Sequence, residues 1–381
     1  MEFTLTEEQQ QLKDSLRRYL DKNYTFEARR QRLKAGARDN KHWSAFAEFG
    51  LLGIGVDEQF GGLGLADSSS EDIMVVMECF GRAMVIEPYL TSAVMCSGIL
   101  RDHGSSEQCA RLLPAMVAGT KTMTLAAHER AGRYQFGHVA TTARRVGERY
   151  VLNGAKSVTL HGDTADTFIV SARTSGKVGD EAGISLFLVD KSAEGLAIRH
   201  YPTFDGQSAA QLEFRDLSVP AQALLGNEGN AHAGIERALA KGVAALCAEA
   251  VGAMDALIEQ TREYVKNRKQ FGVAIGSFQA LQHRMVDMFI ATEQARSITL
   301  LATLKLNAPD AIERRRVTAA AKSLVGQSAR FVGQQAVQLH GGMGVTDELP
   351  ISHYFKRLTA IDLTFGDAHY HRARLGELIG V

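Results

Sequence analysis

Arginine, glutamine and glycine residues that could bind a phosphorylated cofactor recur at two places in the last third of the sequence. They are Arg268-Lys269-Gln270-Phe271-Gly272 with Gln279 shortly after, and Gln338-Leu339-His340-Gly341-Gly342. A guanidinium donates hydrogen bonds in a fixed fork that suits a diphosphate, and neighbouring amides add donors and acceptors. Glycines allow a cofactor to lie directly against backbone N–H groups. The residue types therefore favour a diphosphate-containing cofactor.

Both motifs also have a simpler interpretation as the ends of helices. In that interpretation Arg268 is a cation facing the C-terminal end of a helix dipole, and Gly272 is the C-cap. Gly341 and Gly342 would end a second helix in the same way. Taken one at a time, the motifs fit a helix end better, so only their combination favours a cofactor site.

Signatures of other catalytic classes are absent from the sequence. It contains no Gly-x-Ser-x-Gly, no His-Glu-x-x-His and no Glu-x-x-His, which argues against a serine hydrolase, a zinc protease and a di-iron bundle. The cysteines form no Cys-x-x-Cys pair; they are Cys79, Cys96, Cys109 and Cys247. We therefore predict no metal site and expect a reducing compartment.

The charge balance excludes several kinds of partner. The 381 residues carry 43 Lys and Arg against 43 Asp and Glu, so the formal net charge is zero. Such a chain has no basic footprint for nucleic acid and no polybasic membrane anchor. No apolar run approaches about 18 residues, and the N-terminal segment lacks the pattern of a secretory signal. We expect a cytoplasmic protein that binds no nucleic acid and does not span a membrane.

The predicted elements change in type along the chain. Residues 1–119 show helical periodicity, beginning with a capping box at Thr6 to Gln9. Residues 120–228 carry short apolar or alternating runs that are typical of strands, and Asn153-Gly154 is a strong signal for a hairpin turn. The first part is therefore predicted to be a helical domain and the second a β-domain.

Residues 229–381 are predicted to form a third domain of long helices. Apolar periodicity marks four segments whose lengths suit an antiparallel bundle, at 233–269, 276–306, 311–340 and 351–378. His369 and His371 occupy alternate positions of the last segment, and we expect both at the surface because such positions point apart. The sequence thus predicts a mainly α-helical protein with an inserted β-domain.

Together, the motifs resemble the signatures of the acyl-CoA dehydrogenase family. The resemblance rests on Tyr264 to Gly272 with Phe278, Gln279 and Gln282, and on Gln338 to Gly344 with Glu348 and Pro350. It covers the whole chain and is most specific in the C-terminal third. Leu246 to Ala250 and His353 to Ala360 are most similar to small subunits of pimeloyl-CoA-dehydrogenase-like, heteromeric bacterial enzymes. The fold it implies is an N-terminal helical domain, a middle β-barrel and a C-terminal four-helix bundle.

The resemblance implies an FAD-dependent enzyme that removes α and β hydrogens from an acyl-CoA thioester. It also implies electron-transfer flavoprotein as the acceptor, and either a homo-oligomer or a heterotetramer with a homologous partner subunit. Arg268 would meet the FAD diphosphate across a dimer interface, and Gln279 would meet the adenosine side. The other implied cofactor residues are Gln270, Phe271, Gln338, Leu339, His340, Gly341 and Gly342. Phe271 would pack on the adenine half, with core packing at a helix end as its alternative.

The sequence departs from the family at both walls of the expected flavin pocket. The first flavin loop reads Ala127 to Arg133 in place of Thr-Glu-Pro and Gly-Ser-Asp, and Val158 to His161 stand in place of Trp-Ile-Thr-Asn. The usual catalytic Tyr-Glu-Gly falls on Phe365-Gly366-Asp367, and no glutamate stands near Gly242, the alternative position of the base. The usual ring contacts and the usual base are therefore missing.

Three carboxylates remain as candidates for the base. Asp367 lies nearest to the usual position, with an Asx-type turn as its alternative role. Glu249 would otherwise form a structural ion pair, and Glu129 would otherwise be solvated. Three hypotheses stay open: a subunit of a heteromeric dehydrogenase, a non-catalytic scaffold subunit of such a complex, and a homomeric oxidase or dehydrogenase with a relocated base. Pimeloyl, steroid side-chain, aromatic and short branched acyl groups are all compatible.

Overall fold

The chain forms two compact units, each assembled from separate segments. The computed structural model describes residues 5–36, 40–64 and 69–380. We call residues 1–38, 70–85 and 243–381 the helical unit, and residues 39–69 and 86–242 the β unit. One long helix, α7 (His232–Asn267), contributes to both. Within the described ranges, no helix has both the length and the apolar character that a membrane crossing requires.

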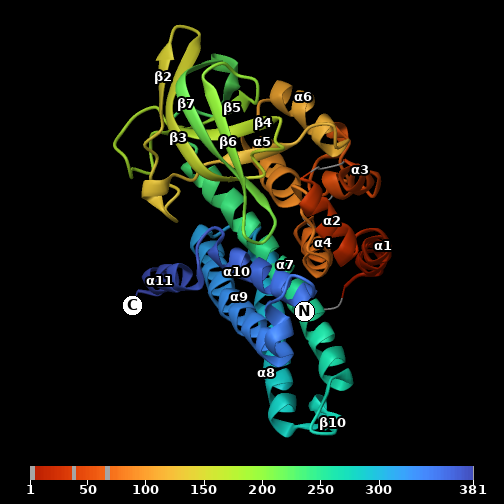
Figure 1. Cartoon of the computed structure of the whole chain (residues 1–381). Coiled ribbons are helices and arrows are strands. Elements are labelled where there is room, and N and C mark those ends of the chain that lie inside the picture. The colour runs from red at the N-terminus through yellow and green to blue at the C-terminus, as the bar shows by residue number, and fades with distance from the viewer. Residues whose placement is uncertain (1–4, 37–39, 65–68, 381) are drawn as a thin grey trace. The chain divides into compact units, whose positions relative to one another are not determined.

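The helical unit is built around α9, which lies against α8, α10 and α11 (Figure 1). Its N-terminal helix begins at the predicted capping box, because Gln9 N donates to Thr6 Oγ1 over 3.2 Å and Thr6 N donates to Gln9 Oε1 over 3.2 Å. Besides α7, the α-helices of this unit include α1 (Glu7–Asn23), α2 (Phe26–Ala35), α4 (Ser69–Ala83), α8 (Gln279–Lys305), α9 (Ala311–His340), α10 (Pro350–Leu363) and α11 (Ala368–Ile379).

The last predicted helical segment is two helices rather than one. Residues 351–378 break between α10 and α11, where Phe365 has a φ of 58° and Gly366 a φ of 108°. A left-handed backbone cannot continue a right-handed helix. Apolar periodicity alone did not reveal the break, because both helices carry such a pattern.

The β unit contains an eight-stranded, mostly antiparallel sheet in the order β6-β7-β3-β2-β4-β5-β8, with β1 parallel to β4. Buried side chains such as Leu152, Phe168 and Phe187, each 0% exposed, form its core. The strands are β1 (Met123–Ala126), β2 (Thr142–Val146), β3 (Arg149–Leu160), β4 (Thr167–Arg173), β5 (Ile184–Asp190), β6 (Leu196–Pro202), β7 (Ser208–Pro220) and β8 (Leu224–Leu225). Its helices include α3 (Lys41–Glu48), the π-helix η3 (Tyr89–Cys96), α5 (Ser97–His103) and α6 (Ser106–Val117).

The hairpin turn predicted at Asn153-Gly154 lies elsewhere. Strands β2 and β3 pair from Val146 opposite Arg149, so Gly147 and Glu148 make the turn, with Gly147 at a φ of 59°. Gly154 instead lies inside β3, where the register with β7 shifts. A Cβ on Gly154 would lie 2.7 Å from Thr141 Cα. Gly154 is therefore needed where two backbone segments approach closely at a β-bulge. The sequence alone does not distinguish a glycine in a bulge from a glycine in a hairpin turn.

Candidate cofactor and active site

The first predicted motif forms a short hairpin at the end of α7. The helix ends at Asn267, and Arg268 is followed by β9 (Lys269–Gln270) and β10 (Val273–Ala274). The two turn residues, Phe271 and Gly272, have φ values of 54° and 82°, as a type I′ turn requires. The interpretation of Gly272 as the C-cap of a helix is therefore wrong.

Phe271 is held away from the interior of its own chain. Its residue surface is 91% exposed, and its ring meets the edge of Phe278 at a centroid distance of 6.2 Å. A bulky residue in the left-handed region is strained, and exposure of a phenyl ring costs further free energy. Core packing of Phe271, the alternative considered from sequence, is excluded.

The second motif lies at the end of α9, next to the end of α7. The His340 ring stacks on Tyr264 at a centroid distance of 4.2 Å, and the Tyr264 hydroxyl donates to the His340 carbonyl over 3.3 Å. Burial lowers the pKa of His340, whose Nδ1 lies 2.8 Å from the Ala336 carbonyl oxygen. Leu339 is buried as well. These two side chains join helix ends and do not face solvent.

The remaining predicted cofactor residues are exposed at this end of the bundle. Arg268 makes no side-chain hydrogen bond or ion pair with the rest of the described chain. A Cβ placed on Gly341 or Gly342 would meet nothing within 4 Å. The exposed set is Arg268, Gln270, Gln279, Gln338, Gly341 and Gly342. Exposed donors and uncovered backbone N–H groups are the kind of surface that can bind a diphosphate.

Asp367, the first candidate base, follows the turn between α10 and α11. It is the N-cap of α11, with Oδ1 accepting a hydrogen bond from Tyr370 N over 2.8 Å. This is the local role that the Asx-type alternative predicts. The side chain is half-buried, so the cap does not enclose it.

Glu249, the second candidate base, is engaged with an arginine. Arg357 Nε donates to Glu249 Oε1 over 2.6 Å and Nη2 donates to Oε2 over 2.7 Å, with both residues buried. A bidentate guanidinium holds both oxygens of the carboxylate. The geometry therefore agrees with the structural ion pair considered from sequence.

Glu129, the third candidate, is buried rather than solvated. Its Oε1 accepts from Lys156 Nζ and Thr141 Oγ1, each over 2.7 Å, and its Oε2 accepts from Ala140 N over 2.8 Å. Burial alone would raise the pKa of Glu129, but the Lys156 charge and these hydrogen bonds hold it below its usual range. A carboxylate stabilised in this way is a poor proton acceptor.

His128, in the altered segment Ala127 to Arg133, contacts Ser157, which directly precedes the altered segment Val158 to His161. The His128 Nδ1 lies 2.9 Å from Ser157 Oγ, and the His128 ring meets the edge of Phe136 at a centroid distance of 6.0 Å. Burial lowers the pKa of His128. No local sequence pattern predicted this contact, because His128 lies in the loop after β1 and Ser157 lies in β3.

The two C-terminal histidines differ in burial. His369 is exposed, as predicted, but His371 is buried, and its Nε2 lies 3.0 Å from the Phe365 carbonyl oxygen. Burial, together with the nearby Lys322 charge, lowers the pKa of His371 to about 4. The prediction for His371 was wrong because the turn before α11 folds back over its ring. Lys322, on α9, contacts the same turn and was not found by motif reasoning.

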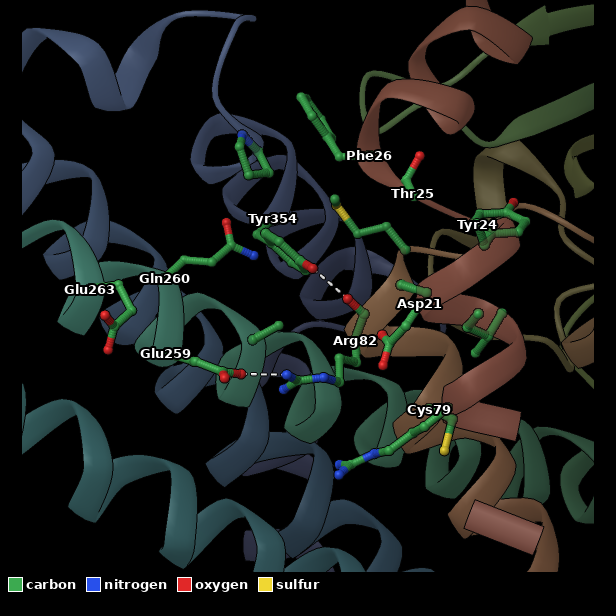
Figure 2. Close-up of a pocket in the computed structure, with 16 residues that line it drawn as sticks. Asp21, Tyr24, Thr25, Phe26, Cys79, Arg82, Glu259, Gln260, Glu263 and Tyr354 are labelled. Atoms are coloured by element: carbon green, nitrogen blue, oxygen red, sulfur yellow. Dashed lines mark hydrogen bonds and ion pairs between the residues drawn. The ribbon is translucent and has the colours of Figure 1, made fainter. Parts of the chain in front are cut away.

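The helical unit also contains a cavity of ≈ 550 Å³ (Figure 2). Figure 2 shows Arg82 facing Glu259, with which it forms an ion pair, and the Tyr354 hydroxyl donating to the Arg82 carbonyl. Asp21 and Gln260 also line it. None of the predicted cofactor residues or candidate bases lines this cavity, so it is separate from the residues considered above.

Three family descriptions match successive parts of the chain. Residues 6–120 match "Acyl-CoA dehydrogenase, N-terminal domain", residues 124–217 match the middle domain, and residues 233–379 match the C-terminal domain. A short-chain specific acyl-CoA dehydrogenase of Clostridium acetobutylicum is 29% identical, over 93% of this chain and 93% of that protein. The mitochondrial isobutyryl-CoA dehydrogenase of Dictyostelium discoideum is 30% identical, over 82% and 75%.

A solved structure agrees over the full length. A chain in the ChsE4-ChsE5 complex from Mycobacterium tuberculosis superposes with a TM-score of 0.90 at 26% identity, covering 100% of this chain and 99% of that one. The helical N-terminal part, the β-domain and the helical C-terminal part are those that the sequence predicts. Because all three domains match in order, the protein belongs to the acyl-CoA dehydrogenase family.

Proposed function

We propose that this chain is an FAD-binding subunit of an acyl-CoA dehydrogenase that oxidises an acyl-CoA thioester between its α and β carbons. The observation that carries the proposal is the open surface at the end of α7 and α9. There Arg268 has no side-chain partner among the described residues, and the backbone of Gly341 and Gly342 is uncovered. FAD would supply the hydride acceptor when bound, and electron-transfer flavoprotein is the proposed final acceptor.

The cofactor residues would each act through a different group. Arg268 would hold the diphosphate through its guanidinium, and Gln270, Gln279 and Gln338 would add neutral donors and acceptors. Phe271 would lie on the adenine half, which would cover a strained and exposed ring. Leu339 and His340 would act through their backbone, since their side chains are buried.

The proposed assembly is a heteromer with a homologous subunit. An exposed half-site needs a second chain to close it, and the relative in the ChsE4-ChsE5 complex is itself part of a two-protein assembly. Exposed apolar side chains on α8, among them Val286, Phe289 and Ile290, supply surface that such a partner would cover.

The proposed base within this chain is Asp367. A thioester α-proton is only weakly acidic, so the carboxylate must work in a slot from which water is excluded. The half-buried Asp367 suits that task better than Glu249, both of whose oxygens bind Arg357, or Glu129, whose Oε1 binds Lys156. If Asp367 serves only as the N-cap, the base lies in the partner subunit.

A non-catalytic scaffold subunit is the second candidate function. It is favoured by the occupied carboxylates of Glu249 and Glu129 and by the cap at Asp367. In that case the chain would complete the partner's flavin site without oxidising substrate at a site of its own.

Purification of the chain alone and together with a homologous subunit tests the proposal. We expect little flavin absorbance and no dye reduction by acyl-CoA from the chain alone, with both appearing in the complex. Robust acyl-CoA oxidation by the isolated chain would overturn the heteromer. A complex that binds FAD and reduces dye normally with Asp367→Asn would place the base in the partner and favour the scaffold function.

A further inference from the structure

The turn between α10 and α11 adopts a strained backbone. Phe365 has a φ of 58°, a conformation that bulky side chains rarely adopt. At Gly366, with a φ of 108°, a Cβ would lie 2.5 Å from Tyr370 Cδ1 and 2.7 Å from His371 Nε2. Such strain persists only where the surroundings determine the backbone from several sides.

Lys322 reaches this turn from inside the helical unit. Its side chain is 0% exposed, and Nζ donates to the carbonyls of Asp362 and Gly366, each over 2.7 Å. The two carbonyls lie on either side of the strained Phe365. Lys322 forms no ion pair within the described part of the chain. The hydrogen bonds of its buried amine go to backbone carbonyls. Burial lowers its pKa to about 8.

Other contacts hold the ends of the turn. Asp362 Oδ1 accepts from Ala368 N over 3.0 Å, and Asp362 Oδ2 accepts from Arg330 Nη2 over 2.9 Å. Ser323 Oγ donates to the Ala368 carbonyl over 3.1 Å. Lys322 Nζ binds the Gly366 carbonyl, and His371 Nε2 lies 3.0 Å from the Phe365 carbonyl oxygen. Lys322 thus joins the last turn of α10 to Gly366.

We propose that Lys322 is a positioning residue, which sets the backbone from which Asp367 extends toward the acyl-CoA substrate. This role rests on the proposed function, in which Asp367 is the base. The carboxylates of Asp362 and Asp367 act on Lys322 from beyond ion-pair distance, so the hydrogen bonds that offset the burial of its ammonium are made to the backbone of the turn. A purely structural lysine would instead join helices without distinguishing this turn from the rest of the unit.

Three variants of the assembled, FAD-loaded enzyme test the proposal. Lys322→Met keeps the length of the side chain and removes its donors, whereas Lys322→Gln keeps an amide donor. Ser323→Ala, on the neighbouring position of α9, removes a contact to Ala368 at the end of the turn and leaves the contacts of Lys322 to Asp362 and Gly366 in place. Flavin reduction at saturating acyl-CoA should fall about 100-fold in Lys322→Met, with KM changed less than about threefold, because small displacements of a reacting group cost this much. We expect Lys322→Gln to recover about tenfold and Ser323→Ala to match the wild type.

Amide hydrogen exchange of the peptide spanning residues 363–371 supplies a readout that does not depend on activity. Exchange should become faster in Lys322→Met and not in Ser323→Ala. The positioning role would be overturned by any of three results. Lys322→Met could reduce flavin at the wild-type rate, Lys322→Met and Ser323→Ala could lose the same activity, or amide exchange in Lys322→Met could be unchanged. Should Lys322→Met fail to assemble, Lys322→Gln decides the same question. Should the wild-type complex reduce no flavin with any acyl-CoA, the proposed function fails, while the exchange measurement still tests whether Lys322 holds the turn.

Discussion

The two units each contain a fully buried lysine, and the two lysines have different partners. Lys156 in the β unit and Lys322 in the helical unit are both 0% exposed, and burial lowers the pKa of each to about 8. Lys156 binds the carboxylate of Glu129 over 2.7 Å, whereas Lys322 binds two backbone carbonyls. Equal burial therefore serves two purposes: one charge is neutralised within a core, and the other restrains a strained turn.

The largest expected effect is on the stability of the β unit. Lys156→Met leaves the Glu129 carboxylate buried without its cation and should lower the free energy of unfolding by about 3–5 kcal/mol. Lys322→Met should cost less, about 1–3 kcal/mol, because it leaves only neutral carbonyls unsatisfied. Urea unfolding of both variants measures the difference.

The double variant Lys156→Met/Glu129→Gln is the control for this comparison. It removes both charges and should recover much of the loss, since the cost comes from an unpaired buried ion. If Lys156→Met and Lys322→Met are equally destabilising, the contrast between the two lysines does not hold.

Mild acid should lower the stability of the helical unit through the buried His371. The folded pKa of His371 is about 4, below the ordinary histidine value of about 6.5, so between these values the unfolded chain binds a proton that the folded chain does not. Stability is full above pH 6.5 and falls as the pH drops toward 4, by roughly 3 kcal/mol at about 1.4 kcal/mol for each pH unit. Glu129, whose pKa is lowered, loses its contribution only at lower pH. Thermal unfolding of wild type and His371→Gln from pH 7 to pH 4 tests this; the same slope in both proteins would contradict it.

At the exposed cofactor surface, substitutions should change flavin binding and leave the fold intact. Arg268→Ala should weaken FAD retention about tenfold or more, since a charge-assisted hydrogen bond contributes roughly 1.5–3 kcal/mol. Arg262→Ala, at an exposed arginine in the last turns of α7, is the matched control. The flavin content of the purified complexes measures this effect. Equal FAD retention in the two variants would show that Arg268 does not bind the cofactor.

The smallest expected effect on stability is at the glycines after α9. Gly342→Val should change unfolding by less than about 0.5 kcal/mol, because it is a surface substitution without a steric neighbour, yet it should exclude FAD by blocking close approach. Gly341→Val should exclude FAD too, but its φ of 59° adds backbone strain that Gly342 avoids. Normal flavin binding by Gly342→Val would leave these glycines as helix terminators only.

The family and the fold were recognisable from the sequence because they depend on local patterns. The capping box at Thr6 and the end of α9 at His340 need only neighbouring residues, and both lie where the pattern predicts them. The residues that failed prediction depend on what folds against them. Asn153-Gly154 lies at a bulge rather than a turn because the Thr141 backbone packs against Gly154. His371 is buried rather than exposed because the turn at Phe365 covers its ring.

The sequence by itself determined the succession of helical, β and helical domains, since periodicity and turn chemistry act over a few residues. It also determined which residue types could bind a diphosphate. Only the tertiary structure decided the state of the candidate bases, because Arg357 is 108 positions from Glu249 and Lys156 is 27 from Glu129. Burial and charge pairing of a carboxylate arise from such distant contacts, and no local pattern encodes them.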